Sequence, residues 1–278
     1  MNIATKKAPS HKANDESSQI PNNGQSKTFS YGFVIPNYNH HLVIADTIKA
    51  LVVFGLPIIL VDDGSNEETQ QVLADIDNNF HQVTLIRREH NGGKGAAVQT
   101  GLAAAYQAGW SHALQVDADG QHDLNDVDRM LKLSLSHPQA LLSGRPIYDD
   151  SISKGRYYGR FISHFWVYIE TLSTDIKDSM CGFRVYPLAA YNQLTQSSRL
   201  GNKMDFDIEV MVKLHWQGVP MVFVETKVHY PENGLSHFNV FDDNVLISLM
   251  HTRLFFGMLW RLPKLILRKL LGKHKDVG

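Results

Sequence analysis

Two acidic residues spaced two apart follow a short apolar segment in the middle of the chain. Asp117 and Asp119 come directly after the apolar run His112–Val116. In an extended segment, side chains two residues apart point the same way, so both carboxylates can face one cation. Mg²⁺ and Mn²⁺ prefer oxygen ligands and are commonly held by one or two carboxylates together with phosphate oxygens. Gln121 continues the alternation with a neutral oxygen, so the pattern predicts a Mg²⁺ or Mn²⁺ site formed by Asp117, Asp119 and Gln121.

A second acidic pair, Asp62 and Asp63, ends an earlier apolar run and is followed by Gly64. A carboxylate there can accept hydrogen bonds from a nucleobase edge or a ribose, while the glycine permits a sharp turn. The alternative is a helix cap at Ser65 or Asn66, because the two glutamates that follow suit the first turn of a helix. Both interpretations are compatible, since the cap would orient the loop that presents the carboxylates.

A glycine-rich segment, Asn91–Gly95, precedes a stretch with helical periodicity. It differs from the P-loop pattern GxxxxGK[ST], because Gly95 follows Lys94 where that pattern requires Ser or Thr. It also lacks the GxGxxG spacing of a dinucleotide-binding fold. A glycine-rich turn that opens a helix can still bind an anion through backbone N–H groups. Lys94 adds a positive charge, so the segment predicts an anion-binding turn.

A sheet is expected to position these groups, because each of them follows an apolar run. Short apolar runs alternate with longer amphipathic ones, which is typical of a mainly parallel sheet with helices on both faces. The expected strands are Tyr31–Ile35, Ile58–Val61, Val83–Ile86, Ala113–Val116 and Ala140–Leu142. The expected helices are His41–Phe54, Glu67–Asn78, Lys94–Ala108, Leu124–Ser136 and Lys203–Gln217, and the aromatic run Tyr157–Tyr168 is expected as a core helix or the lining of an acceptor groove. Ligands bind at the carboxyl ends of such strands, so four polar loops, beginning with Pro36–Asn39, are expected to line one cleft. For any single loop, ordinary turn chemistry is the alternative.

The composition is that of an ordinary globular protein. The chain has 278 residues, of which 43 % are hydrophobic and 20 % charged, and this excludes wholesale disorder. Its 27 basic and 28 acidic residues argue against a nucleic-acid partner, and the single Cys181 excludes an internal disulfide and a cysteine-based zinc site. Residues 1–28 are polar and lack the apolar core of a secretory signal, so we expect a disordered tail there. No run of about 18 uncharged apolar residues occurs, so no transmembrane helix is expected.

The motifs together resemble the nucleotide-diphosphosugar glycosyltransferases of family 2, which have the GT-A fold. Within that family, the resemblance is to the branch typified by dolichyl-phosphate mannosyltransferase and bacterial polyprenyl-phosphate glycosyltransferases. The matching motifs, in chain order, are Ile35-Pro36-x-Tyr38-Asn39, Val61-Asp62-Asp63-Gly64-Ser65, Asn91-x-Gly93-Lys94-Gly95, Asp117-x-Asp119-x-Gln121-His122, Ser143-Gly144-Arg145, Asp178-x-x-Cys181-Gly182-Phe183-Arg184 and Phe206-Asp207-Ile208-Glu209. The resemblance runs from about Phe29 to about Ser236, and it implies an α/β GT-A domain over residues 29–241 with a mainly parallel central sheet.

The resemblance also implies roles for individual residues. It implies an inverting, metal-dependent transferase that moves a sugar from a nucleotide-diphosphate sugar to a lipid-linked acceptor such as a polyprenyl phosphate. The residues expected to hold the donor are Pro36, Asn39, Asp62, Asp63, Lys94, Asp117 and Arg145. The cation, Mg²⁺ or Mn²⁺, is expected on Asp117, Asp119 and Gln121, where it neutralises the departing diphosphate. The residues expected to act in catalysis are Asp119, Arg184 and Asp207.

The acceptor decides whether a general base is needed. A lipid phosphate is already anionic and requires no strong base. A hydroxyl on a glycolipid or polysaccharide is the alternative acceptor, and Asp205 or Asp207 would then be the base. Arg145, Arg160 and Arg184 are candidate clamps for the diphosphate or an acceptor phosphate, because guanidinium groups bind phosphate in a forked geometry. For Arg160, a surface charge on a helix is the alternative.

Two rival functions are weighed against this one. A nucleotidyltransferase on a related sheet also needs a carboxylate-bound metal, but it would carry a basic, glycine-rich loop after the first strand, and Asn37–His41 is not one. A catalytically idle binding module with the GT-A fold would be favoured by loss of an acid between Asp117 and Gln121, and none is lost. Two positions depart from the family pattern, since Pro231 stands where a late loop has Arg and Gly120 where the prototypes have Leu or a similar residue.

The carboxyl-terminal residues 242–278 combine basic residues with many Leu, Ile, Phe and Met. At about 100° per residue, Arg261, Lys264 and Arg268 share one face, with Ile266 among the apolar residues opposite. This pattern predicts basic amphipathic helices that lie on an anionic membrane surface, with packing on the catalytic domain as the alternative. Pro263 is expected to split the region into two helices. We therefore expect a cytoplasmic protein that is peripheral at the inner face of the cytoplasmic membrane.

Overall fold

The computed structural model describes residues 29–147, 154–228 and 239–271, and its centre is a seven-stranded sheet with the order β3-β2-β1-β4-β6-β5-β7. The strands are β1 (Tyr31–Asn37), β2 (Ile58–Asp62), β3 (Val83–Arg87), β4 (His112–Gln115), β5 (Leu141–Ile147), β6 (Arg184–Pro187) and β7 (Met221–Lys227). Neighbouring strands are parallel, except that β6 is antiparallel to β4 and β5. The predicted mainly parallel sheet is confirmed. β6 and β7 were not predicted, because β6 has only four residues and begins with Arg, while β7 carries charged residues in its second half.

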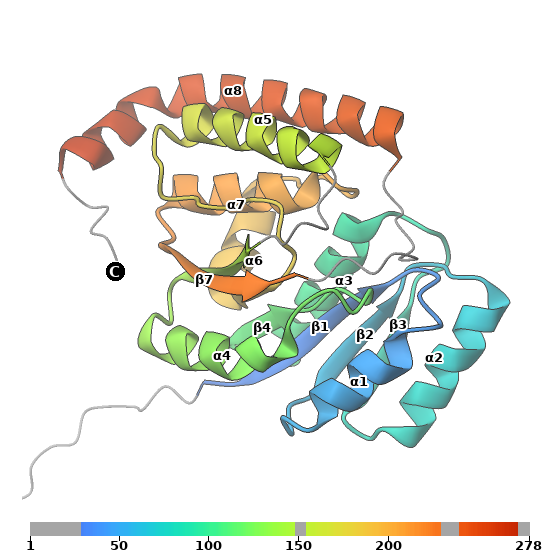
Figure 1. Cartoon of the computed structure of the whole chain (residues 1–278). Coiled ribbons are helices and arrows are strands. Elements are labelled where there is room, and N and C mark those ends of the chain that lie inside the picture. The colour runs from blue at the N-terminus through green and yellow to red at the C-terminus, as the bar shows by residue number, and fades with distance from the viewer. Residues whose placement is uncertain (1–28, 148–153, 229–238, 272–278) are drawn as a thin grey trace, which may run out of the picture.

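Helices cover both faces of the sheet (Figure 1). α1 (Ile44–Val52), α2 (Glu67–Asn79) and α4 (Val127–Ser136) contribute to the hydrophobic core on one face. α3 (Lys94–Gln107), α6 (Leu188–Ser197) and α7 (Phe206–Gln217) contribute to the core on the other. A further layer, formed by α5 (Lys154–Thr171) and α8 (Val240–Leu270), lies outside α7. The expected helices between the first five strands are all present; Leu124–Asp126 forms a 3₁₀ turn ahead of α4.

The position of α7 between two layers explains why nearly all of its side chains are buried. The sequence predicted one buried face with Phe206, Val210 and Leu214, and these residues are buried. The opposite side of α7 is buried as well, because α5 and α8 pack on it. Trp216 of α7, for example, donates a hydrogen bond from Nε1 to the carbonyl oxygen of Glu170 in α5 at 2.8 Å. The outer layer is therefore an integral part of the described fold.

The carboxyl-terminal region forms one helix where two were predicted. α8 runs without interruption from Val240 to Leu270 and contains Pro263 in its interior. A proline removes only one helical hydrogen bond and strains one turn. Packing on both sides of Pro263 compensates for this, because Met258 before it and Leu265 after it are buried in the core. The last turns bend toward α7 (Figure 1), which is the change of direction that an interior proline allows.

The basic face predicted for this region lies largely against the domain. Arg261 lies over the ring of Trp216, 4.6 Å from its centroid, and Arg268 donates hydrogen bonds of 2.7 Å to the carbonyl oxygens of His215 and Trp216. These carbonyls end α7, where cations are favoured by the helix dipole. Packing on the domain, the alternative to the predicted membrane-surface helix, is thus present for Arg261 and Arg268, and Lys264 of the basic set stays exposed.

The structure also corrects the expectation that no segment is long and apolar enough to cross a membrane. Phe241–Leu270 meets that criterion by length and composition, with a mean hydropathy of 1.2 in its most apolar 18-residue window. Only 28 % of that window is buried, so most of it is open. Three predictions fall outside the described residues: the disordered tail at 1–28, most of the late loop that contains Pro231, and the end of the basic region beyond residue 271.

Candidate active site

The loops with candidate residues meet at one edge of the sheet. β1, β2 and β4 run parallel and end at this edge. Antiparallel β6 begins there, which brings Arg184, its first residue, to the same edge. α3 begins with Lys94, and Asp207 lies in the first turn of α7. Side-chain contacts between these segments show that the four-loop arrangement expected from the sequence is present.

Lys94 joins two carboxylates from different segments. Its Nζ lies 2.8 Å from Oδ2 of Asp117 and 3.0 Å from Oδ2 of Asp207. Burial alone would lower the pKa of Lys94, but the two carboxylates outweigh burial and the pKa is raised. The ammonium group therefore stays charged throughout the physiological range. The sequence predicted that Lys94 binds an anion, and in the structure its ammonium group pairs with these two carboxylates.

Asp117 has protein partners for both of its oxygens. Besides Lys94, Gln115 donates a hydrogen bond from Nε2 to Oδ1 at 3.1 Å, and His122 Nε2 lies 3.4 Å from Oδ2. Burial would raise the pKa of Asp117, but Lys94 and His122 outweigh it and hold the pKa well below its usual range. Asp117 is thus an ionised carboxylate that the protein itself neutralises. To bind a metal through Oδ2, it would have to share that oxygen with Lys94.

Asp119 and Gln121 form the open part of the predicted metal site. Both are partly exposed, and Asp119 Oδ1 accepts a hydrogen bond from the backbone N–H of Gln121 at 3.1 Å. Gly120 between them has a φ of +69°, which turns the loop. A carboxylate and an amide oxygen fit Mg²⁺ or Mn²⁺ when phosphate oxygens and water complete the shell. Within the described residues, no group of three or more His, Cys, Asp and Glu side chains is placed to hold a metal by itself.

Asp62 shapes the turn that follows β2. It is buried, and its Oδ1 accepts a hydrogen bond from the N–H of Ser65 at 3.0 Å. The helix cap considered from the sequence is also present, since the side chain of Asn66 accepts a hydrogen bond from the N–H of Thr69 at 3.0 Å. The helix-cap interpretation is therefore confirmed, and the cap orients the loop in which Asp62 lies; the contact of Asp62 with a nucleoside stays a prediction.

Asp63 stabilises the glycine-rich loop from inside the protein. Its carboxylate accepts hydrogen bonds from the backbone N–H groups of Gly92 at 3.1 Å and Gly93 at 2.8 Å, and it pairs with Arg88. Only 2 % of Asp63 is exposed. The direct contact with a donor predicted for this residue does not fit this geometry, because both oxygens are used in the loop. Asp63 instead fixes the backbone that starts α3 and so positions Lys94.

The end of β1 contains a candidate that the sequence analysis did not single out. Asn37 is 1 % exposed, and its side-chain oxygen and nitrogen lack hydrogen-bond partners in the described structure. A buried, unpartnered polar group costs about 1–3 kcal/mol, so such a group marks a place for a ligand or water. Asn39, with φ +56°, instead links the loops, because its Oδ1 accepts a hydrogen bond from the N–H of Asn66 at 2.9 Å. Pro36 is buried opposite Val61 of β2, and its contact with the donor stays a prediction.

Arg184 holds the start of α7 from within the domain. Its Nη1 donates to the carbonyl oxygen of Asp207 at 2.7 Å, and its Nη2 donates to that of Ser179 at 2.8 Å. Nη1 also lies 3.7 Å from Oδ1 of Asp207. The side chain is 0 % exposed, so the predicted direct clamp on a phosphate is wrong for Arg184. It is a positioning residue for Asp207.

Arg145 and Arg160 belong to a second, basic group of residues. Arg145 is 53 % exposed at the end of β5, whereas Arg160 of α5 is 20 % exposed and pairs with Asp178 at 2.5 Å. Burial lowers the pKa of His164, and nearby cations lower it further despite Asp178. These cations are Arg160, Arg145 and Lys177. Both arginines have a carboxylate partner, because Arg145 lies 3.5 Å from Glu225 and Arg160 pairs with Asp178, so Arg160 is more than an isolated surface charge.

Gly182 is required by the closeness of the Asp117–Lys94 pair. A Cβ atom at this position would lie 2.4 Å from Oδ2 of Asp117 and 2.8 Å from Nζ of Lys94. A cavity of about 270 Å³ lies beside Asp117, between α1 and the loop that follows β4. It is lined by Val43, Asp46, Thr47, Ala50, Val116, Asp117, Gly120, His122 and Leu124. Asp117 and His122 are therefore the members of the charged centre that border this cavity.

The family to which this site belongs follows from the sequence of the region that forms it. The family described as Glycosyl transferase family 2 matches residues 33–194, more than half of the chain. This chain belongs to glycosyl transferase family 2. It is therefore a family 2 glycosyltransferase, and the match spans the Asp117–Gln121 loop, Lys94 and Arg184.

Curated relatives of this family 2 protein include dolichyl-phosphate transferases. A dolichyl-phosphate beta-glucosyltransferase, ALG5D of Trichomonas vaginalis, is 28 % identical over 65 % of this chain and 60 % of its own length. A dolichyl-phosphate beta-glucosyltransferase of Dictyostelium discoideum is 23 % identical over 81 % of this chain and 74 % of its own. The UDP-N-acetylglucosamine–dolichyl-phosphate N-acetylglucosaminyltransferase of Methanococcus voltae is 26 % identical over 60 % of this chain and 72 % of its own.

Solved structures show the same fold. Glucosyl-3-phosphoglycerate synthase from Mycobacterium tuberculosis, in complex with Mn²⁺, uridine-diphosphate-glucose and phosphoglyceric acid, has a TM-score of 0.60 at 14 % identity, over 83 % of this chain and 79 % of that one. TarS 1–349 of S. aureus in complex with UDP has a TM-score of 0.55 at 14 % identity, over 84 % of this chain and 71 % of that one. The GT-A fold expected from the sequence is confirmed.

Proposed function

We propose that this family 2 protein is an inverting, metal-dependent glycosyltransferase that moves a sugar from a nucleotide-diphosphate sugar to a lipid-linked acceptor, such as a polyprenyl phosphate. The observation that carries the proposal is the charged centre at the sheet edge, where Lys94 lies between Asp117 and Asp207 beside the open Asp119–Gln121 loop. The dolichyl-phosphate acceptors named for three relatives support the choice of acceptor.

The residues around this centre have distinct tasks in the proposed reaction. Asp119 and Gln121 would hold Mg²⁺ or Mn²⁺, and such an ion supplies charge neutralisation for the diphosphate leaving group. Lys94 keeps its positive charge beside the same loop and, together with His122, keeps Asp117 ionised. The unpartnered amide of Asn37 is available to a polar group of the nucleoside. Asp62 and Asn39 stabilise, through hydrogen bonds, the loops that would surround the nucleoside.

The acceptor is proposed to be a phosphate because a cation lies beside each candidate base, Lys94 beside Asp207 and Arg253 beside Asp205. Asp207 is paired with Lys94 and lies beside Arg184, so its carboxylate is held by cations. Asp205 accepts a hydrogen bond from the N–H of Lys203 at 3.1 Å, and its Oδ2 lies 3.7 Å from Arg253. A lipid phosphate needs no base, and the exposed side chains of Arg145 and Lys177 are positive charges within reach of one.

The same acceptor chemistry leads us to propose that the protein is peripheral at the inner, cytoplasmic face of the membrane, bound through the region that begins at residue 242. A sugar donor that carries a diphosphate is water-soluble, whereas a lipid-linked acceptor stays in the bilayer. The enzyme must therefore work at the boundary between the two.

The experiment is a donor-hydrolysis and transfer screen with UDP-, GDP- and dTDP-sugars in the presence of Mn²⁺ or Mg²⁺. Release of nucleoside diphosphate is measured with and without a polyprenyl phosphate. We expect metal-dependent release that the lipid phosphate accelerates, and we expect Asp119→Ala to abolish it with little change in stability. Asp128→Ala, an exposed carboxylate on α4, is the matched control and should keep full activity. Full activity in Asp119→Ala would refute the metal assignment, and stimulation by a hydroxyl acceptor alone would refute the lipid phosphate.

A further inference from the structure

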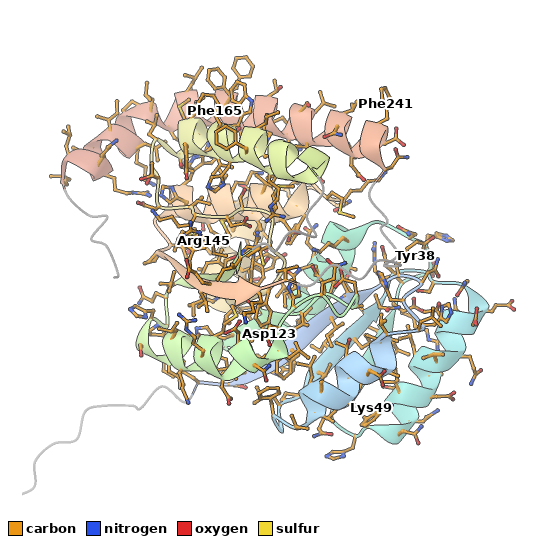
Figure 2. All side chains as sticks on the ribbon, viewed as in Figure 1. Tyr38, Lys49, Asp123, Arg145, Phe165 and Phe241 are labelled. Carbon is orange, nitrogen blue, oxygen red and sulfur yellow. The ribbon has the colours of Figure 1, made fainter. Side chains whose placement is uncertain are left out.

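The outer layer exposes a long apolar surface on two neighbouring helices. α5 and α8 lie side by side over α7 (Figure 1), and side chains such as Phe165 and Phe241 extend outward from them (Figure 2). On α5 the exposed large apolar residues are Phe161, Ile162, Phe165 and Trp166. On α8 they are Phe241, Val245, Leu249, Phe256, Leu259, Trp260, Ile266, Leu267 and Leu270. We call these thirteen residues the apolar platform.

The platform corrects the prediction that the aromatic run of α5 is a core helix. The inward side of α5 is indeed buried at Val167 and Glu170, but Phe161, Phe165 and Trp166 are exposed. Trp166 is 38 % exposed and Phe161 is 67 % exposed. From residue 159 to the end of α5, none of the exposed positions carries a charge. Single exposed apolar residues are common on protein surfaces, but a contiguous apolar face of this size marks an interaction site.

α8 is apolar on two opposite sides. Its inner side buries Met250, Leu254 and Leu265 against the domain. Its outer side, followed at about 100° per residue, runs from Val245 through Phe256 to Leu270, and no basic residue falls within it. Lys264 and Lys269 lie on either side of this stripe and are exposed, whereas Arg261 and Arg268 contact α7. An apolar stripe between basic flanks is typical of a helix at the surface of an anionic membrane.

Several contacts fix α8 against the domain along its length, so it is not free to cross a bilayer. Near its middle, Nδ1 of His251 lies 2.8 Å from Oε1 of Glu170 in α5, and both residues are buried. Near its end, Arg268 donates to the two carbonyl oxygens that close α7, and Lys269 donates to the carbonyl oxygen of Leu172. A helix of 31 residues is about 46 Å long at about 1.5 Å per residue, longer than the about 30 Å apolar thickness of a bilayer.

We infer that α5 and α8 form one membrane-docking surface that lies flat on a single anionic leaflet, with the platform inserted among the lipid headgroups. Trp260, which is 86 % exposed, would lie at the boundary between headgroups and acyl chains, where tryptophan is favoured. Lys264, exposed on one flank of α8, would face the lipid phosphates. The inference goes beyond the proposed function by including α5 and by setting the orientation of α8. It rests on that proposal only for the reason why a membrane is the partner.

The orientation can be measured with single cysteines, because the native Cys181 does not compete for labelling. Burial raises the pKa of Cys181 to about 12, so its thiol is both covered and protonated. The full-length protein is labelled with an environment-sensitive fluorophore at Phe165→Cys, Val245→Cys, Phe256→Cys or Leu267→Cys. Lys49→Cys on α1, far from the platform (Figure 2), is the matched control. The probes are vesicles of phosphatidylcholine alone and with one quarter phosphatidylglycerol.

We expect anionic vesicles to shift the emission of the four platform labels to the blue and to leave the Lys49→Cys label unchanged. Quenchers placed at different depths should report one shallow depth for the labels at 245, 256 and 267, because the helix lies flat. A label at 256 that is much deeper than those at 245 and 267 would show a spanning helix and overturn the inference. No response to vesicles would overturn it as well, and so would concentration-dependent dimers whose formation alone shifts the platform labels.

The test is independent of the enzyme's reaction. It is performed without donor or acceptor and is repeated in Asp119→Ala, which should bind vesicles as the unmodified protein does. Vesicle binding without any transfer activity would refute the proposed function and leave the docking surface intact. Transfer activity without vesicle binding would refute the docking surface and leave the proposed function intact. The unreactive Cys181 in each variant serves as the check that the protein is folded.

Discussion

Adding one methyl group at Gly182 should disable the donor site while leaving the fold in place. In Gly182→Ala, the new Cβ would lie 2.4 Å and 2.7 Å from the two carboxylate oxygens of Asp117 and 2.8 Å from Nζ of Lys94. An ordinary contact of about 3.5 Å requires a displacement of about 1 Å. Because Gly182 lies on the short segment between Asp178 and β6, whose backbone Asp178 and Arg184 hold, the ion pair is the part that must move.

The size of the effect follows from these distances. Stretching the Asp117–Lys94 contact from 2.8 Å by about 1 Å weakens the attraction by about 1.5 kcal/mol at an effective dielectric constant of about 20. Overpacking a filled site costs about 1–3 kcal/mol, so the unfolding free energy should fall by an amount in this range. A displacement of about 1 Å at the reacting groups reduces turnover by about 100-fold.

Three measurements check this prediction: nucleoside diphosphate release, calorimetric binding of nucleoside diphosphate with Mn²⁺, and urea denaturation. Gly159→Ala is the matched control, because Gly159 lies in α5 with no atom within 4 Å of the position a Cβ would take. It should keep full turnover and, as an alanine in a helix, gain about 0.5–1 kcal/mol of stability. Wild-type turnover and binding in Gly182→Ala would refute the assignment of the Asp117–Lys94 pair to the donor site.

Three further predictions concern buried groups. Arg184→Gln should lower the unfolding free energy in urea by about 3–5 kcal/mol, because it removes the buried cation that two carbonyl oxygens and a carboxylate share; a loss below 1 kcal/mol would show that the site reorganises freely. Burial lowers the pKa of His112 below its ordinary 6.5, so the unfolded chain binds the proton more tightly. Stability should therefore fall as the pH drops from about 6.5 toward the folded pKa, by at most about 1.4 kcal/mol per pH unit, and His112→Asn should remove that part of the slope in urea titrations at pH 7 and 5. Because the pKa of Cys181 is raised to about 12, a thiol reagent at pH 8 should modify the native protein far more slowly than the urea-unfolded chain, and equal rates would contradict its burial.

The sequence by itself was sufficient for the framework of the donor site. The polar motifs follow apolar runs, and the carboxyl ends of parallel strands necessarily share one edge of a sheet. This rule places the motifs of Asp62, Lys94 and Asp117 at one edge from the sequence alone. The same local patterns set the helix cap at Asn66, because capping depends on residues three apart in the chain.

Contacts between distant residues decided the tasks of the individual side chains. Arg184 and Asp63 have the charge and the motif of ligand-binding residues, yet the structure buries both of them as supports for the loops. Nothing in the sequence marks Asn37 as a binding residue except its place at the end of a strand. It is distinguished in the structure because its side-chain amide is buried and lacks a hydrogen-bond partner. Burial and pairing depend on the chain packing from residues far away in sequence, which a local pattern does not contain.

The carboxyl-terminal helix shows the same division. Its composition and its 100° periodicity are properties of the sequence, and they indicated an amphipathic helix with affinity for lipid. The sequence did not show that Arg261 and Arg268 would contact the end of α7. It also did not show that α5 would lie beside α8 with Phe161, Phe165 and Trp166 exposed. Periodicity determines which residues share a face of a helix, but the direction in which that face points is determined by the helices that pack against it.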